Sequence, residues 1–394
     1  MMPKVRRWVF FLAIFFTVFL GDLAAAQAAV VPVGSLVDEV RTLTEKYYAG
    51  PLSRAALEAE AVQGLVESLG DPYSEYIAPE DLPDFASSLN DEYTGVGIIF
   101  QDLEGRAVIS KTVPGSPAAR LGVAPGSVLV AVDGRPVKGL SLEEIGRLLS
   151  GKPGTYVYLT VTLPGSGSRR SYYLRREVIR PPVVSSRLLA GSVGYLYLRS
   201  FPYWAPGEVE TALAELEARG ARGIILDLRG NPGGYLDAAL EIASLFLLPD
   251  KPVVQVVGRD KKVTVLRSRG PGRDLPLVVL VDRGTASAAE ILAGALQANH
   301  AAILVGTRTY GKGALQTIFP LSNGGALKLT TAYYRTPAGE AIDGVGLIPD
   351  IEVTEGRKQL DRALNVLRAQ IAPPLVVGNL ACRLFTLPFF QATR

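Results

Sequence analysis

Cysteine and histidine are almost absent from this chain of 394 residues, which contains only Cys382 and His300. A single cysteine excludes an internal disulfide framework, a cysteine-rich zinc or iron–sulfur site and a two-thiol redox centre. A single histidine excludes any site with two histidine ligands, and a serine nucleophile paired with histidine would have to use His300. Neither a metal nor an organic cofactor is needed for the chemistry predicted below.

A large excess of charge of one sign is also lacking. The chain has 41 basic and 38 acidic residues, a net charge of +3 and no long run of either sign, so nucleic acid is not an expected partner. With 48% apolar residues the chain can bury a large core, which excludes general disorder. Its length predicts two or three domains.

The N-terminus has the pattern of an export signal. A basic start at residues 4–7 precedes an apolar run at 8–20 and small residues at 24–28. The run is short for a membrane span, so we predict a signal peptide over residues 1–28, with an uncleaved membrane anchor as the alternative. Either way the working part is expected outside the cytoplasm, in the periplasm, the cell envelope or an equivalent lumen.

The rest of the chain divides by its hydrophobic periodicity into an N-terminal helical segment, a compact β-rich unit, an α/β unit and a tail. Strands alternate with helices of crossover length in the α/β unit, which predicts an α/β fold. Gly and Pro turns separate short β-branched runs in the β-rich unit, which also contains one helix at 142–149. The expected bounds are 35–90, 91–176, 183–365 and 366–394, and the role of the last segment is open.

Ser287 is the first candidate for chemistry. Residues 277–290 have the pattern of a buried strand, a turn of small residues and the start of a helix. Unpaired amides and the helix dipole favour negative charge there, which would stabilise the oxyanion formed when a serine attacks a carbonyl. The plainer alternative is a helix-capping serine.

A serine nucleophile needs a base, and His300 lies about 20 Å from Ser287 at 1.5 Å per helical residue. Lys312 is the remaining candidate, because burial can lower the pKa of a lysine toward neutrality. Gln316 could hold that lysine by a hydrogen bond without stabilising its charged form as a carboxylate would. Residues 306–312 also match most of a phosphate-binding loop, but Gly313 replaces the hydroxyl residue that binds magnesium.

A glycine turn supplies a third element. Residues 224–234 form an apolar strand pattern that runs into Asn-Pro-Gly-Gly. Such turns expose backbone amides, so Gly233 or Gly234 could complete an oxyanion hole with the amide of Ala288 or Ser287. A tight strand-to-helix turn without a catalytic role is the alternative.

In combination these motifs resemble the carboxy-terminal processing peptidases, or tail-specific proteases. The resemblance covers nearly the whole chain after the signal, and its further motifs are residues 71–74, 93–97, 336–339 and 346–350. It implies a ClpP/crotonase-like α/β core in which Ser287 is the nucleophile, Lys312 the general base and Gln316 its orienting partner.

The resemblance also implies that the β-rich unit is a PDZ domain inserted before the protease core. Its carboxylate-binding loop would be Gly95, Val96, Gly97 and Ile98, whose amides capture a C-terminal carboxylate while the peptide adds to the sheet as a strand. Ile145 and Leu149 would line the side-chain pocket. Many relatives have Arg where this chain has Ser150, so activation by the domain and simple tethering of substrate both remain open.

These features predict an exported serine endopeptidase that binds proteins and peptides with apolar C-termini and cleaves near that end. A non-catalytic PDZ scaffold that presents tails to another protease is the main alternative. An enzyme acting on CoA esters is a weaker one, because export and the serine–lysine pair disfavour it. The N-terminal helices are expected to mediate a homodimer, as in relatives.

Overall fold

The computed structural model describes residues 33–371, which fall into two units that divide between residues 61 and 62. The first unit contains α1 (Val33–Tyr47) and the start of α2 (Arg54–Glu67), as the sequence predicted for this region. Ion pairs of 3.5 Å join Arg41 to Glu58 and Arg54 to Glu45. The predicted signal peptide and most of the predicted tail lie outside the described residues. Within the described range, no helix is both long enough and apolar enough to cross a bilayer.

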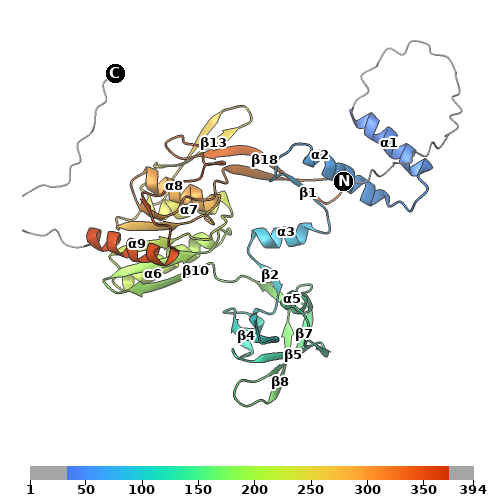
Figure 1. Ribbon diagram of the computed structural model, residues 1–394, viewed down its shortest axis with the longest axis horizontal. Helices are drawn as coiled ribbons and strands as arrows, with labels where there is room; N and C mark the ends of the chain where they lie inside the picture. The colour runs from blue at the N-terminus through green and yellow to red at the C-terminus, as the bar shows by residue number, and fades with distance from the viewer. Residues whose placement is uncertain (1–32, 372–394) are drawn as a thin grey trace, which may run out of the picture. The chain divides into compact units, whose positions relative to one another are not determined.

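The second unit begins with a short connecting region and continues into the β-rich unit (Figure 1). The connecting elements are β1 (Glu75–Ile77), α3 (Leu82–Leu89) and β2 (Tyr93–Gly95). The β-rich unit consists of β3 (Ile98–Leu103), β4 (Arg106–Thr112), α4 (Pro117–Arg120), β5 (Val128–Val132), β6 (Arg135–Pro136), α5 (Leu142–Leu149), β7 (Tyr156–Thr162) and β8 (Arg169–Arg175). Its main sheet has the order β3-β4-β5-β7-β8, so β3 is an edge strand.

The α/β unit follows from residue 177. Its elements are β9 (Glu177–Ile179), β10 (Val184–Leu189), β11 (Val193–Leu198), α6 (Ala205–Ala218), β12 (Gly223–Asp227), α7 (Leu236–Phe246), β13 (Pro252–Gly258), β14 (Val263–Arg267), β15 (Leu277–Val281), α8 (Ala288–Ala298), β16 (Ile303–Gly306), β17 (Ala314–Pro320), β18 (Ala326–Arg335), β19 (Ile351–Glu352) and α9 (Gly356–Ile371). The first of these, β9, pairs with β2 in a two-stranded sheet.

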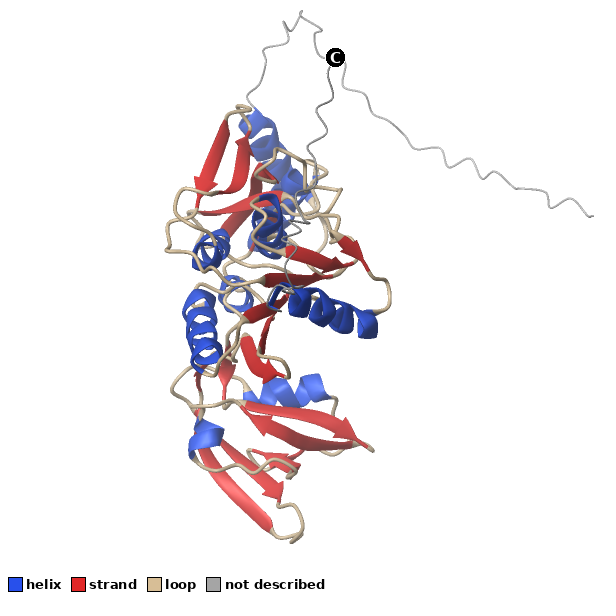
Figure 2. Cartoon of the chain, turned by 90° about the vertical axis from the view of Figure 1, so that its left-hand side faces the viewer, coloured by secondary structure: helices blue, strands red, loops and turns tan. Residues whose placement is uncertain are grey.

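A central sheet of order β10-β11-β12-β15-β16-β19 organises this unit, and all its pairs except β10–β11 are parallel. Every residue of β12 and β15 is buried, as expected for strands that are covered on both faces. One face packs against α6, α7 and α8, and the other packs against α9. Figure 2 shows helices on both sides of the strands. The α/β class predicted from the sequence is confirmed.

A second, antiparallel sheet was not anticipated. It has the order β1-β18-β13-β14, and β17 pairs with the other edge of β18, opposite β1 and β13. Through this sheet the segment just after α2 lies against strands close to the end of the described chain. Helix α9 was also not anticipated, and it continues past residue 365, where the sequence placed the end of the core.

Candidate active site

Ser287 lies at the N-cap position of α8, where the sequence placed it. Strand β15 ends at Val281, and a short turn leads to Ser287, whose backbone has φ 55° and ψ −120°. A positive φ is unfavourable for a serine, so the surrounding contacts must hold this conformation. Two such contacts come from Thr285, whose hydroxyl accepts from the Asp282 amide at 2.9 Å and donates to the Leu228 carbonyl at 2.9 Å.

The glycine turn after β12 lies directly against the serine. A Cβ atom on Gly233 would be 2.8 Å from the Cβ of Ser287, and one on Gly234 would be 2.4 Å from the carbonyl oxygen of Phe201. Both glycines have positive φ, at 99° and 148°. Glycine is therefore required at both positions for the turn to approach the serine this closely.

Asn231, which the sequence analysis did not single out, holds the glycine turn to the serine turn. Its side-chain carbonyl accepts from the Gly233 amide at 2.9 Å, and its backbone carbonyl accepts from the Ala286 amide at 2.9 Å. The Gly233 amide is thus already bonded, whereas the Gly234 amide has no acceptor within residues 33–371. The amide of Ala288 belongs to the first residue of α8, a position that lacks an intrahelical acceptor.

Lys312 lies in the loop between β16 and β17, and its side chain is half-buried. Its Nζ atom is 4.9 Å from the centroid of the Tyr73 ring. Burial lowers the pKa of Lys312 from its ordinary value, and the positive charge of Lys328 lowers it further. Both effects favour the neutral amine that a general base requires.

A buried carboxylate connects the serine segment to the lysine segment. Glu290 is fully buried, and its Oε2 accepts hydrogen bonds from the amides of Ser287 at 2.8 Å and Lys312 at 2.9 Å. Its Oε1 accepts from the Thr309 hydroxyl at 2.5 Å and the Gly311 amide at 2.7 Å. This carboxylate fixes the two backbone segments at one distance. The sequence showed Glu290 only as part of the helix-start motif.

Gln316 is bonded to its neighbouring strand. Its side-chain amide donates to the Thr330 hydroxyl on β18 at 3.3 Å. Within the described chain, neither Gln316 nor Ser287 forms a hydrogen bond with the Lys312 amine. His300 follows α8 in a turn with φ 56° and is exposed, as expected.

The predicted carboxylate-binding loop connects the end of β2 to the start of β3. Gly95 belongs to β2, and the carbonyls of Val96 and Gly97 accept from the amides of Ala118 at 3.0 Å and Val113 at 2.9 Å. Gly97 has φ 76°, and a Cβ atom on it would be 2.1 Å from the Cβ of Ser116. Glycine is therefore required at this position.

Helix α5 packs beside β3. Ile145 and Leu149, the residues predicted to line the side-chain pocket, are only 1% and 5% exposed and belong to the core of the β-rich unit, as does Ile98. Ser150 ends the helix. The carbonyls of Leu148 and Leu149 at that end accept from the guanidinium of Arg176, each at 3.0 Å.

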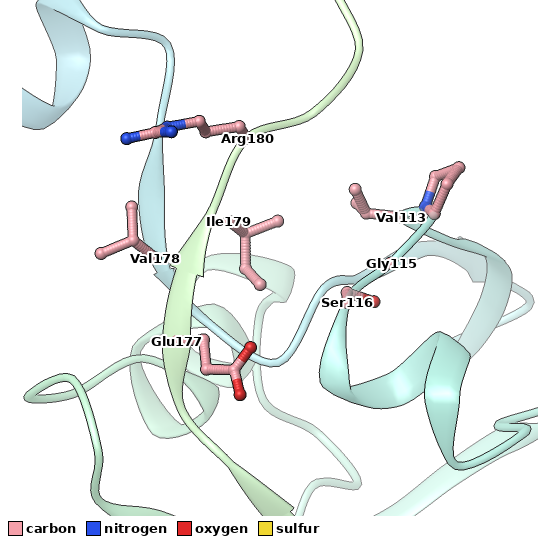
Figure 3. A pocket seen from close by; sticks show the side chains of 8 residues that line it. Val113, Gly115, Ser116, Glu177, Val178, Ile179 and Arg180 are labelled. Atoms are coloured by element: carbon pink, nitrogen blue, oxygen red, sulfur yellow. The ribbon is translucent and has the colours of Figure 1, made fainter.

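A cavity of about 430 Å³ lies beside β9, between this strand and the loop 113–116 (Figure 3). Figure 3 shows Glu177 on the strand, Arg180 just after its end and Ser116 across from them. Glu177 pairs with Arg120 at 2.7 Å, and Arg180 pairs with Glu92 at 3.0 Å. Because these charges are already paired, the cavity adds no reactive group to the candidate site. The described residues also contain no cluster of His, Cys, Asp and Glu that could hold a metal ion.

Comparisons with known proteins agree with this arrangement. Residues 192–353 match the model of peptidase family S41, and residues 108–162 match a PDZ domain model. The chain is 38% identical over 320 residues to a carboxyl-terminal-processing protease of Synechocystis, a match that covers 79% of this chain and 74% of the relative. It is 35% identical to the carboxy-terminal processing protease CtpA of Bacillus subtilis, over 74% of this chain but only 63% of that protein.

A solved structure shows the same architecture. The photosystem II D1 C-terminal processing protease aligns with a TM-score of 0.51 and 31% identity, over 84% of this chain and 92% of that one. The expected ClpP/crotonase-like core with an inserted PDZ domain is thereby confirmed, and peptides or proteins are the substrates of this class of enzyme. The chain belongs to peptidase family S41, as a serine-type peptidase of the carboxyl-terminal-processing group with a PDZ domain.

Proposed function

We propose that this chain is an exported serine endopeptidase that binds the free, apolar C-terminus of protein substrates through its PDZ domain and cleaves near that end. The carboxylate of Glu290 is the observation that carries the proposal. It accepts hydrogen bonds from the backbone amides of both Ser287 and Lys312, so the residues that carry the proposed nucleophile and base are held together through their backbones. This pair accounts for a serine protease without a histidine base.

In the proposed reaction the neutral amine of Lys312 takes the proton of the Ser287 hydroxyl as Oγ bonds to the substrate carbonyl carbon. The carbonyl electron pair moves to oxygen, and the amide of Ala288 together with that of Gly233 or Gly234 binds the oxyanion. Collapse of this intermediate breaks the C–N bond, and the leaving amine takes the proton from Lys312. Water then hydrolyses the acyl-enzyme by the same route.

Gln316 is proposed to orient the amine of Lys312 during this cycle. Its side chain is hydrogen-bonded to Thr330 at 3.3 Å, so this role requires that the side chain turns from Thr330 toward the lysine. Hydrogen bonds between catalytic groups commonly form or shorten only when substrate binds. The structure is therefore compatible with a resting enzyme.

Substrate capture is assigned to the free edge of β3. A peptide can add there as a further strand, while its carboxylate bonds to amides of the loop formed by Gly95, Val96, Gly97 and Ile98. The buried side chains of Ile145 and Leu149 would contact the last apolar side chain if α5 shifts on binding. The near-neutral chain gives little electrostatic steering, which favours selection by apolar residues.

Export and assembly complete the proposal. Export is based on the leader pattern at residues 1–28, and a leader that is retained would tether the enzyme to the membrane. A homodimer through the N-terminal helices is based on α1, where Leu36, Val40 and Tyr47 are exposed at 57%, 56% and 67%. A monomeric sedimentation profile would contradict the dimer.

The decisive experiment measures cleavage of an unstructured peptide that ends in Leu-Ala-Ala, with a free or an amidated C-terminus. The purified protein, its Ser287→Ala variant and the control Ser322→Ala, which alters an exposed serine in the β17–β18 turn, are compared. We expect the unaltered protein and the control to cut only the free peptide, and Ser287→Ala to cut neither.

Other outcomes separate the parts of the proposal. Cutting of both peptides would keep the serine mechanism but reject recognition of the carboxylate. Cutting by Ser287→Ala would reject the assigned nucleophile. Binding of the free peptide without cutting by any protein would favour the scaffold role.

A further inference from the structure

The turn of residues 71–74 is fixed to strand β18 by hydrogen bonds. The carboxylate of Asp71 accepts from the Tyr73 amide at 3.1 Å and from the Ser74 hydroxyl at 2.5 Å. The Ser74 oxygen in turn accepts from the Thr330 amide at 3.0 Å. Strand β1, which begins at the next residue, pairs with β18 (Figure 1). Tyr73 is therefore presented from a rigid turn.

The ring of Tyr73 faces the amine of Lys312. The Nζ atom is 4.9 Å from the ring centroid, within the range in which an aromatic face attracts a cation. No ion pair of Lys312 occurs in the described part of the chain, and the Tyr73 ring lies within the range in which it attracts the charge of this amine. Burial raises the pKa of the Tyr73 hydroxyl, and the nearby charges of Tyr310 and Asp343 raise it further, so the phenol stays neutral.

We infer that Tyr73 is a positioning residue for the base, whose ring holds the Lys312 amine in place and stabilises the ammonium that forms when this amine takes the Ser287 proton. The inference rests on the proposed role of Lys312. No atom of Tyr73 takes part in bond making, because the proton moves from the Ser287 oxygen to the Lys312 nitrogen and later to the leaving amine.

The ring acts against other groups near Lys312. Lys328 on β18 and burial disfavour the ammonium, whereas the ring of Tyr73 favours it. A general base must be neutral before it accepts a proton, and its positive charge must then be stabilised in the transition state. The titratable side chains around this position are those of Asp71, Tyr73, Glu290, Tyr310, Lys328 and Asp343.

The test compares Tyr73→Leu, which keeps an apolar cover but removes the aromatic face, with Tyr73→Phe, which keeps the face. Phe85→Leu is the matched control, because the Phe85 ring lies 5.6 Å from the amine of Lys328 instead. Each change is made in the full chain with Ser287→Ala. Trace acetylation with acetic anhydride across pH, read by mass spectrometry at Lys312, then reports titration of this amine without any need for activity.

We expect Tyr73→Leu to move the titration of Lys312 to lower pH by roughly half a unit, with Tyr73→Phe and Phe85→Leu unchanged. In the active proteins the same change should lower kcat about threefold and shift the acidic limb of the pH profile in the same direction. Equal titration of Lys312 in all four proteins would overturn the inference. A shift in labelling that the pH profile of activity does not follow would instead reject Lys312 as the base.

Discussion

Gly233 lies so close to Ser287 that a Cβ atom on the glycine would be 2.8 Å from the Cβ of the serine. The same atom would be 2.8 Å from the Ala286 carbonyl oxygen, which belongs to the backbone and cannot turn aside. The glycine turn and Ser287 therefore cannot both keep their positions if residue 233 carries a side chain.

Gly233→Ala should lower kcat/KM at least about a hundredfold, because displacement of reacting groups by about 1 Å has effects of this size. Gly230→Ala is the matched control. Gly230 also has a positive φ, of 67°, but no atom lies within 4 Å of the added Cβ. Both variants have backbone strain, but only Gly233→Ala also adds a clash, so its melting temperature should fall further, and activity is compared at a temperature where both variants are folded. Equal activity of the two variants would contradict the role given to this close approach.

Glu290→Gln tests the carboxylate that joins the serine and lysine segments. The side-chain NH2 group of glutamine would replace one carboxylate oxygen. The buried backbone amides that donate to that oxygen would then have no acceptor. We expect a loss of roughly 3 kcal/mol in the free energy of unfolding, measured by urea denaturation, and a drop of at least tenfold in kcat. The control Glu210→Gln alters an exposed carboxylate on α6 and should change neither.

The acidic limb of the pH profile should respond to Lys328. The protonated form of Lys312 cannot accept a proton, so activity rises as pH passes its pKa, which burial and Lys328 lower. Removing the positive charge in Lys328→Met should move the limb to higher pH. Glu75→Gln should move it to lower pH, because Glu75 pairs with Lys328 at 3.0 Å and offsets that charge. Shifts of the same sign in both variants would argue against this account.

Arg176 holds the C-terminal end of α5 in the PDZ domain. Besides the carbonyls of Leu148 and Leu149, its guanidinium bonds to the carbonyl of Tyr156 at 2.7 Å, and its side chain is 11% exposed. Arg176→Met should expose these carbonyls and destabilise the domain by roughly 2 kcal/mol. Faster amide hydrogen exchange in α5 would show this destabilisation. The control Arg175→Met, which alters the exposed neighbouring residue, should leave the exchange rates unchanged.

The strands of the central sheet could be predicted from the sequence because burial on both faces leaves continuous apolar runs. The buried strand expected within residues 277–290 is β15, and the apolar strand expected within residues 224–234 is β12. Strand β18 was missed because most of its residues are half-exposed. Its Lys, Thr and Tyr side chains interrupt the apolar pattern by which a buried strand is predicted. Helix α9 was missed because charged residues obscure its buried positions, such as Ala363 and Leu367.

The position of Ser287 at the start of α8 could be predicted from a local signal, a buried strand followed by small residues. The role of Glu290 could not, because a glutamate three residues after a helix cap usually has only local partners. Its bonds to the segment 309–312 depend on how α8 packs against the loop after β16. The contact of Tyr73 with Lys312 likewise depends on a sheet that joins distant parts of the chain.

That sheet determines when Tyr73 can reach Lys312 during folding. The Ser74 hydroxyl bonds to a residue 256 positions further along the chain, and β1 has no partner other than β18 among the described strands. Closing a loop of this length has an entropic cost that only the assembled sheet offsets. A chain made from its N-terminus therefore cannot place Tyr73 over the lysine until almost all of it has been synthesised. The contribution of Tyr73 to the base would then be acquired only after β18 has formed.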